Sequence, residues 1–211
     1  GAGWSGAILT SSDGRGWIER DSGVYNSFSG VAYGNGVFVA VGDSGLIMIS
    51  QNAVLWTKST PGTSYDLAGV TFGNGTLVAV GYNKLMTSPD GIQWKAGVVP
   101  GAKFLREVVY AQSRFVAVGL SGAILTSEDA NAWVARDSGS SEWLDDIAYG
   151  NGIFVVVGDS GTILTSGDGV RWSKQTSGTA NDLDGVAFGG GMFVVVGRSG
   201  TILTSADVRV W

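Results

Sequence analysis

The sequence predicts an all-β fold made of repeated four-stranded units, and three observations lead to this prediction. Tryptophan recurs every 38 or 39 residues, at Trp17, Trp56, Trp94, Trp133, Trp172 and Trp211. An apolar block such as YGNGVFVAVG, which begins at Tyr33, lies upstream of all but the first of these tryptophans. Glycine supplies 35 of the 211 residues, against an average share of roughly 7%, while proline supplies only 3. Four-strand units of about 40 residues, repeated along a chain, are typical of a β-propeller.

The strands expected within each unit follow one another in a fixed order. The first has the pattern LxxVAY or LxxVAF, as from Leu183 to Phe188, and the second has the pattern FVAVG. The third has the pattern GxILTS, and the fourth begins at the tryptophan, as at residues 172–175. Asn-Gly between the first two strands predicts a type I′ hairpin, because both residues tolerate positive φ. Val, Ile, Phe, Tyr and Thr dominate these segments, and no stretch carries a helical apolar stripe.

The repeats fill the whole chain, so we expect a single domain over residues 1–211. Its units cover approximately residues 1–27 (partial), 28–66, 67–104, 105–143, 144–182 and 183–211. Trp17 to Trp211 spans five periods, which predicts five blades closed by the N-terminal hairpin beside the strands at 184–197. Residues 198–211 then duplicate that hairpin. Six or more blades, or completion by a partner chain, are the alternatives. Closure within one chain predicts a monomer, and the duplicate also allows a strand-swapped oligomer.

The composition excludes several classes of function. The chain has no His and no Cys, so it has no Ser-His-Asp or Cys-His relay, no His-bearing metal site, no disulfide and no iron–sulfur cluster. A net charge of −5 disfavours binding to nucleic acid. No apolar run approaches the length of a membrane span. The sequence also contains no D-x-D-x-D-G loop of the kind that binds Ca²⁺. We expect no cofactor or metal. We also expect an extracellular or periplasmic location, because the absence of Cys is compatible with it.

Each tryptophan closes a short serine-and-carboxylate box, such as SSDGRGW at residues 11–17. This pattern resembles the Asp-box (BNR-like) repeats of sialidase-type and photosystem-assembly-factor-type propellers, over essentially the whole chain. The resemblance implies that the Ser and Asp hydrogen-bond the loop and that the Trp packs between strands. The second box departs from the pattern, with Asn52 in place of Asp and Ala53 in place of Gly. The structural residues that the resemblance implies are Asp13, Trp17, Asp90, Trp94, Asp129, Trp133, Asp168 and Trp172.

Residues that differ between repeats at one structural position are better candidates for function than the boxes. In a four-stranded blade, the turn between the second and third strands lies on the same face as the connection to the next blade. The candidate ligand-binding residues at these variable positions are Trp4, Asp43, Tyr65, Tyr82, Trp143, Asp159 and Arg198. Aromatic rings beside carboxylates suit sugars, because rings stack on C–H faces while carboxylates accept hydroxyl hydrogen bonds. Free variation of exposed turn residues is the alternative explanation.

These observations favour a non-catalytic binding or scaffold propeller that presents a protein- or ligand-binding face. The alternative is a multivalent lectin-like propeller, in which several weak sites act together. A sialidase-like glycoside hydrolase is less favoured. It requires a pair of carboxylates, for which the candidates are Asp43, Asp66, Asp159, Asp182 and Glu142. It also requires an arginine cluster, and only Arg106 and Arg198 map near this face.

Overall fold

The computed structural model describes residues 1–60, 62–101 and 104–211, and the chain is built from antiparallel β-sheets. Helical structure in these ranges is limited to four three-residue 3₁₀ turns: η1 (Trp4–Gly6), η2 (Asp43–Gly45), η3 (Leu120–Gly122) and η4 (Arg198–Gly200). The prediction of an all-β fold is therefore confirmed. The chain forms two compact units, Gly1–Val99 and Pro100–Trp211, and each is described by itself.

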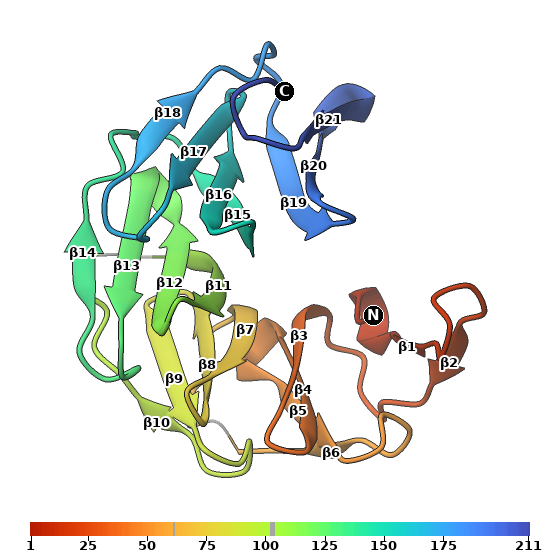
Figure 1. Cartoon of the computed structure of the whole chain (residues 1–211). Helices are drawn as coiled ribbons and strands as arrows, with labels where there is room; N and C mark the ends of the chain where they lie inside the picture. The colour runs from red at the N-terminus through yellow and green to blue at the C-terminus, as the bar shows by residue number, and fades with distance from the viewer. Residues whose placement is uncertain (61, 102–103) are drawn as a thin grey trace. The chain divides into compact units, whose positions relative to one another are not determined.

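The first unit contains two four-stranded sheets and one two-stranded sheet, coloured red to yellow-green in Figure 1. The first four-stranded sheet consists of β3 (Phe28–Gly34), β4 (Val37–Gly42), β5 (Ile47–Ser50) and β6 (Thr57–Lys58). The second consists of β7 (Leu67–Gly73), β8 (Thr76–Gly81), β9 (Lys84–Ser88) and β10 (Lys95–Ala96). The small sheet pairs β1 (Ile8–Thr10) with β2 (Ile18–Arg20). The first strands of the two larger sheets, β3 and β7, lie against each other.

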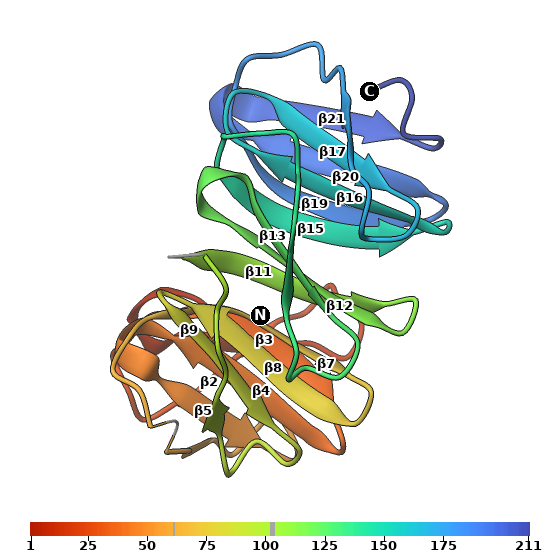
Figure 2. The same cartoon turned by 90° about the vertical axis from the view of Figure 1, so that its left-hand side faces the viewer.

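The second unit contains two four-stranded sheets and one three-stranded sheet, which Figure 2 shows from a second direction. The first sheet consists of β11 (Leu105–Ala111), β12 (Arg114–Gly119), β13 (Ala123–Ser127) and β14 (Val134–Arg136). The next consists of β15 (Leu144–Gly150), β16 (Ile153–Gly158), β17 (Thr162–Ser166) and β18 (Ser173–Gln175). The last consists of β19 (Leu183–Gly189), β20 (Met192–Gly197) and β21 (Thr201–Ser205). β15 packs between β11 and β19.

The strand pairing differs from the expected five-blade arrangement. β20 pairs with β21, from Phe193 opposite Ser205 to Gly197 opposite Thr201. The edge of β20 that was expected to receive the N-terminal hairpin is therefore filled by the duplicate segment at 198–211. This segment follows β20 through a short turn and has the third-strand sequence of the other repeats, so local pairing prevails. The six sheets, one for each box, indicate six blades rather than five, the first with two strands and the last with three.

The turns have the backbone geometry that the glycine pattern predicts. In the first hairpin turn Asn35 has φ 50° and Gly36 has φ 80°, so both have the positive φ of a type I′ turn. The turn between β4 and β5 also uses two left-handed residues, Ser44 with φ 56° and Gly45 with φ 71°. Any side chain at Gly45 would run into the carbonyl oxygen of Thr63. This turn can therefore lie flat against the connection to the next sheet, where the candidate binding residues are found.

In the four-stranded sheets the second and third strands supply most of the buried core, together with first-strand residues such as Leu67 and Leu144. In the second unit a buried phenylalanine of the second strand lies between an aromatic residue of the first strand and the box tryptophan. The ring centroid of Phe115 is 4.6 Å from that of Tyr110 and 6.2 Å from that of Trp133. Phe154 repeats this arrangement in the next sheet, with Tyr149 at 4.7 Å and Trp172 at 6.4 Å. These contacts tie the box turn to the sheet that precedes it.

Candidate functional site

The box turns are closed by side chains that accept backbone N–H groups. Asp13 Oδ1 accepts hydrogen bonds from the backbone nitrogens of Arg15 at 2.8 Å and Gly16 at 3.0 Å. Ser11 donates its hydroxyl to Asp13 Oδ1 at 3.1 Å and accepts the N–H of Gly14 at 2.8 Å. Backbone donors hold the pKa of Asp13 below its usual range, and they lower that of Asp168 to about 2. Each such carboxylate is already engaged within its own turn.

The second box keeps the same geometry without a carboxylate. Asn52 Oδ1 accepts from the backbone nitrogens of Val54 at 2.9 Å and Leu55 at 3.0 Å. Trp56 donates its indole N–H to the carbonyl oxygen of Ala53 at 3.2 Å, as Trp133 does to Ala130 at 3.0 Å. The turn therefore requires an acceptor oxygen at this position, and either an amide or a carboxylate can supply it.

The first unit brings two of the predicted binding residues together as an aromatic pair. The rings of Tyr65 and Tyr82 have centroids 6.0 Å apart and are inclined by 24°, and each side chain is about half exposed, at 48% and 49%. Lys84 Nζ lies 5.2 Å from the centroid of the Tyr65 ring, within range of a cation–π contact. Asp66 next to Tyr65 accepts the backbone N–H of Ser44 at 2.7 Å, which fixes the connection to the preceding turn.

The other two candidates in the first unit lie in equivalent turns. Trp4 is the first residue of η1 and is 86% exposed. Asp43 is the first residue of η2, and its backbone N–H donates to the carbonyl oxygen of Ser27 at 3.0 Å. The Asp43 side chain is partly exposed. The structure thus gives both side chains access to solvent.

The second unit links its three candidates through the connections between sheets. Asp159 donates its backbone N–H to the carbonyl oxygen of Trp143 at 3.0 Å, so these two residues are neighbours. Trp143 is 48% exposed. The corresponding bond in the next turn runs from Arg198 to Asp182 at 2.8 Å. Arg198 Nη1 also contacts Asp182 Oδ2 at 3.0 Å, and Ser160 N donates to Asp182 Oδ1 at 3.0 Å.

Carboxylates outnumber arginines around these residues. Burial raises the pKa of Asp159, and the negative charges of Asp182 and Glu142 raise it further, while Arg198 and Arg106 oppose the shift. Burial also raises the pKa of Asp145, although Arg106 contacts its carboxylate at 2.9 Å. The turns around Asp159 therefore carry more carboxylates than arginines, an arrangement that suits a cationic group.

Sequence reasoning missed two carboxylates in the first strands of the second unit. Asp146 Oδ1 accepts from Ile147 N and Asp146 Oδ2 from Val186 N, both at 2.8 Å, so it bridges β15 to β19. Glu107 on β11 occupies the equivalent place and accepts from Val108 N at 2.9 Å. Burial raises the pKa of Glu107 to about 8 and that of Asp146 to about 6. The sequence feature that could have identified them is a charged residue within an apolar strand pattern, in LREVVY and LDDIAY.

These two carboxylates lie where each first strand has a register shift. The pairing of β11 with β12 skips between Leu105 and Glu107, and that of β15 with β16 skips between Leu144 and Asp146. A β-bulge changes the direction in which the side chain points at that position. Among the described residues, no three acidic side chains are grouped so that they could hold a metal ion. No helix within the described ranges is long and apolar enough to cross a membrane.

Comparison with known proteins shows which solved structures share the fold of this chain. No known protein family and no curated protein matches the chain. A solved structure of YCF48 bound to a D1 peptide matches with a TM-score of 0.77 at 18% identity, over 100% of this chain and 74% of that one. YCF48 from Cyanidioschyzon merolae matches with a TM-score of 0.67 at 18% identity, over 94% and 76%. A nidogen–laminin complex matches with a TM-score of 0.67 at 12% identity, over 96% and 87%. At these identities the likeness concerns the fold, which is the β-propeller fold of the photosystem assembly factor YCF48.

Proposed function

We propose that this chain is a non-catalytic propeller that binds a partner protein through an extended peptide segment of net positive charge. The observation that carries the proposal is the half-exposed pair of Tyr65 and Tyr82 beside the turn at Ser44. Tyrosine rings on a protein surface supply large contact areas at low entropic cost, and they are enriched among residues that dominate binding energy.

The charge of the chain supports a basic peptide as the ligand. The chain carries a net charge of −5, and the connections beside the tyrosine pair hold two carboxylates, Asp43 and Asp66, against Lys84. Complementary charge increases the association rate and selects against acidic partners. The likeness to a YCF48 structure that contains a D1 peptide supports a peptide as the ligand class.

A peptide array that contains basic, neutral and acidic sequences tests this proposal. We expect the labelled chain to bind basic peptides. By isothermal titration calorimetry, Tyr65→Ala and Tyr82→Ala should each weaken the best peptide by about tenfold or more. Tyr25→Ala is the matched control, because Tyr25 is 93% exposed and lies outside the pair. Equal losses for Tyr25→Ala and Tyr65→Ala would show that the pair is not the site, and a preference for acidic peptides would refute the charge argument.

A lectin-like role is the second candidate, and the inclination of 24° between the two tyrosine rings favours it. Nearly parallel, half-exposed rings offer a platform for the C–H face of a sugar, with Asp66 nearby as an acceptor. A glycan array, read with and without Ca²⁺, separates the two candidates. Sugar binding that is lost in Tyr65→Ala, together with a blank peptide array, would replace the first proposal. Release of free sugar from the bound glycan would instead indicate a glycoside hydrolase.

A further inference from the structure

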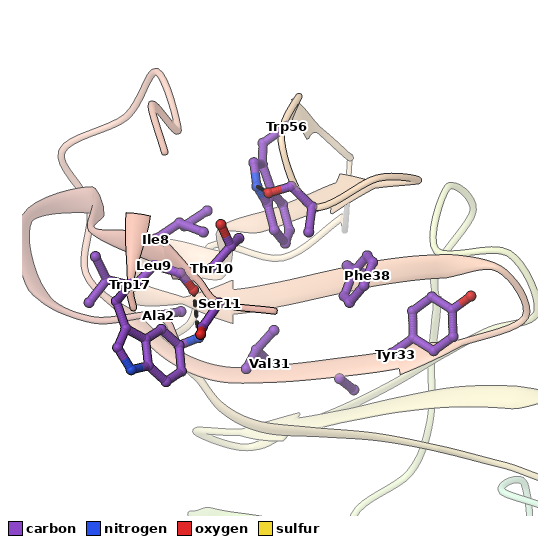
Figure 3. Close-up of a pocket in the computed structure, with 13 residues that line it drawn as sticks. Ala2, Ile8, Leu9, Thr10, Ser11, Trp17, Val31, Tyr33, Phe38 and Trp56 are labelled. Carbon is purple, nitrogen blue, oxygen red and sulfur yellow. Dashed lines mark hydrogen bonds between the residues drawn. The ribbon is translucent and has the colours of Figure 1, made fainter. Parts of the chain in front are cut away.

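The first unit carries two aromatic surfaces, and the charges beside them differ. A cavity of about 400 Å³ is lined mainly by apolar side chains of β1, β3 and β4 and by two box tryptophans (Figure 3). No acidic side chain is among the described residues that line this cavity. The pair of Tyr65 and Tyr82 instead lies next to the turn of Asp43, because Ser44 of that turn donates its N–H to Asp66 at 2.7 Å. A basic ligand therefore fits the tyrosine pair better than the cavity.

The backbone around the tyrosine pair is already engaged within the chain. Tyr82 donates its N–H to the carbonyl oxygen of Asp66 at 3.0 Å, and Tyr65 donates its N–H to a threonine hydroxyl at 3.2 Å. β8 and β9 pair with each other as far as Gly81 opposite Lys84, directly at the turn. The site therefore presents side chains to a ligand rather than the free edge of a strand, which β-strand addition requires.

The spacing of the two rings also limits the conformation of the ligand. Their centroids are 6.0 Å apart, their planes are inclined by 24°, and both side chains are about half exposed. A bound α-helix needs a longer row of anchors, because its positions i and i+7 are about 10 Å apart. A polyproline II helix has three residues per turn, so two of its three rows of side chains can rest on a surface. Residues two positions apart on these rows are separated by about 6.2 Å along the axis, which matches the spacing of the rings.

We propose, on the basis of the proposed function, that the tyrosine pair binds a polyproline II segment of the partner. Two prolines that are two positions apart lie on the rings of Tyr65 and Tyr82, and a flanking basic residue contacts Asp43. Such a segment keeps its backbone solvated, so it needs no hydrogen-bond partner from the engaged backbone of the site. It is also preformed, so it loses little conformational entropy when it binds to aromatic side chains.

Lys84 accounts for the uncharged residues over the rings. Its Nζ lies 5.2 Å from the centroid of the Tyr65 ring, so a positive charge is already present there and repels a second cation. The side chain of Asp43 is partly exposed and belongs to the turn of the preceding sheet. The basic residue of the ligand is therefore favoured beside Asp43 rather than over the rings.

Two synthetic peptides of equal charge test this assignment. The first is Ac-Arg-Arg-Ala-Pro-Ala-Pro-Ala-Arg-Arg-NH2, which is basic at both ends so that either direction of binding is allowed. In the second peptide, both prolines are replaced by alanine. By isothermal titration calorimetry, the proline peptide should bind at least about tenfold more tightly than the alanine peptide.

Variants of one ring show whether the aromatic face is responsible for this ratio. Tyr82→Phe keeps the ring and should keep the ratio, whereas Tyr82→Leu keeps only an apolar side chain and should bring the ratio close to one. Tyr25→Leu is the matched control and should keep the ratio, because Tyr25 is 93% exposed and lies outside the pair. Asp43→Asn should weaken both peptides equally and leave the ratio unchanged. Circular dichroism verifies that each variant is folded.

The outcomes separate this ligand class from the proposed function. Equal affinities for the two peptides, both weakened by Tyr82→Leu, would overturn the polyproline II segment and leave a basic peptide as the ligand. A proline preference that survives in folded Tyr82→Leu would also overturn it. So would binding of other basic peptides from the array but of neither test peptide. Unchanged affinities in Asp43→Asn would overturn the contact with Asp43. Binding of no basic peptide at all would overturn the proposed function as well.

Discussion

Truncation of the buried box tryptophan, Trp133→Ala, should destabilise the chain strongly. Trp133 is 8% exposed, its ring packs against Phe115 at 6.2 Å, and its Nε1 donates to the carbonyl oxygen of Ala130 at 3.0 Å. An aromatic side chain of this kind buries roughly 200 Å². At about 25 cal/mol per Å² this area corresponds to about 4–5 kcal/mol, as an upper estimate. We therefore expect the free energy of unfolding to fall by about 3–5 kcal/mol, as for other buried aromatics.

Trp17→Ala is the matched comparison, because Trp17 holds the same box position and is 53% exposed. With less than half of its surface buried, its truncation should cost about 1–2 kcal/mol. Urea unfolding followed by circular dichroism gives the free energies, and hydrogen exchange with mass spectrometry reports each compact unit separately. A loss below about 1 kcal/mol for Trp133→Ala would refute the packing argument. So would a larger loss for Trp17→Ala than for Trp133→Ala.

Two further predictions concern charge. Burial raises the pKa of Glu107 from 4.5 to about 8, so its contribution to stability is present below pH 4.5 and is lost as the pH rises through about 8. In Glu107→Gln the unfolding free energy, measured by urea titration, should decrease less between pH 4.5 and pH 8 than in the unmodified chain. The charges of Asp146 and Arg106 are still present in this variant. Asn52→Asp should raise the unfolding free energy at neutral pH by up to about 1 kcal/mol, because a charged acceptor strengthens the bonds from Val54 and Leu55; a decrease would contradict this.

Much of the fold could be predicted from the sequence because its determinants are local. The strand order follows from short patterns that recur along the chain, and the type I′ turn at Asn35 and Gly36 follows from an Asn-Gly pair that three of the five blocks share. The number of blades could not be predicted, because the segments that contain Ile8 and Ile202 are almost identical. Local pattern does not decide which of two equal strands pairs with β20, and the shorter connection to Ile202 does.

The candidate site was predicted only in part, for a similar reason. Tyr65 and Tyr82 were selected because they vary between repeats at exposed turns, and the structure brings their rings within 6.0 Å of each other. Glu107 and Asp146 were missed because they lie within first strands, where the pattern indicated only alternating strand residues. Both lie at a bulge, and Asp146 also depends on the backbone of a neighbouring strand; neither feature is visible in one repeat by itself.

The bridge made by Asp146 has a consequence for how far the repeats are modular. In the second unit its carboxylate spans from β15 to Val186 of β19, where Gly185 leaves the room that it needs. In the first unit the equivalent residue is Gly30, and a Cβ there would come within 3.2 Å of the backbone nitrogen of Val70. A shuffled chain that placed an Asp146-type repeat ahead of β7 would therefore require the backbone of β7 to shift by a few tenths of an ångström. Copies that look interchangeable in sequence are fitted to particular neighbours, and their order along the chain is itself part of the encoded structure.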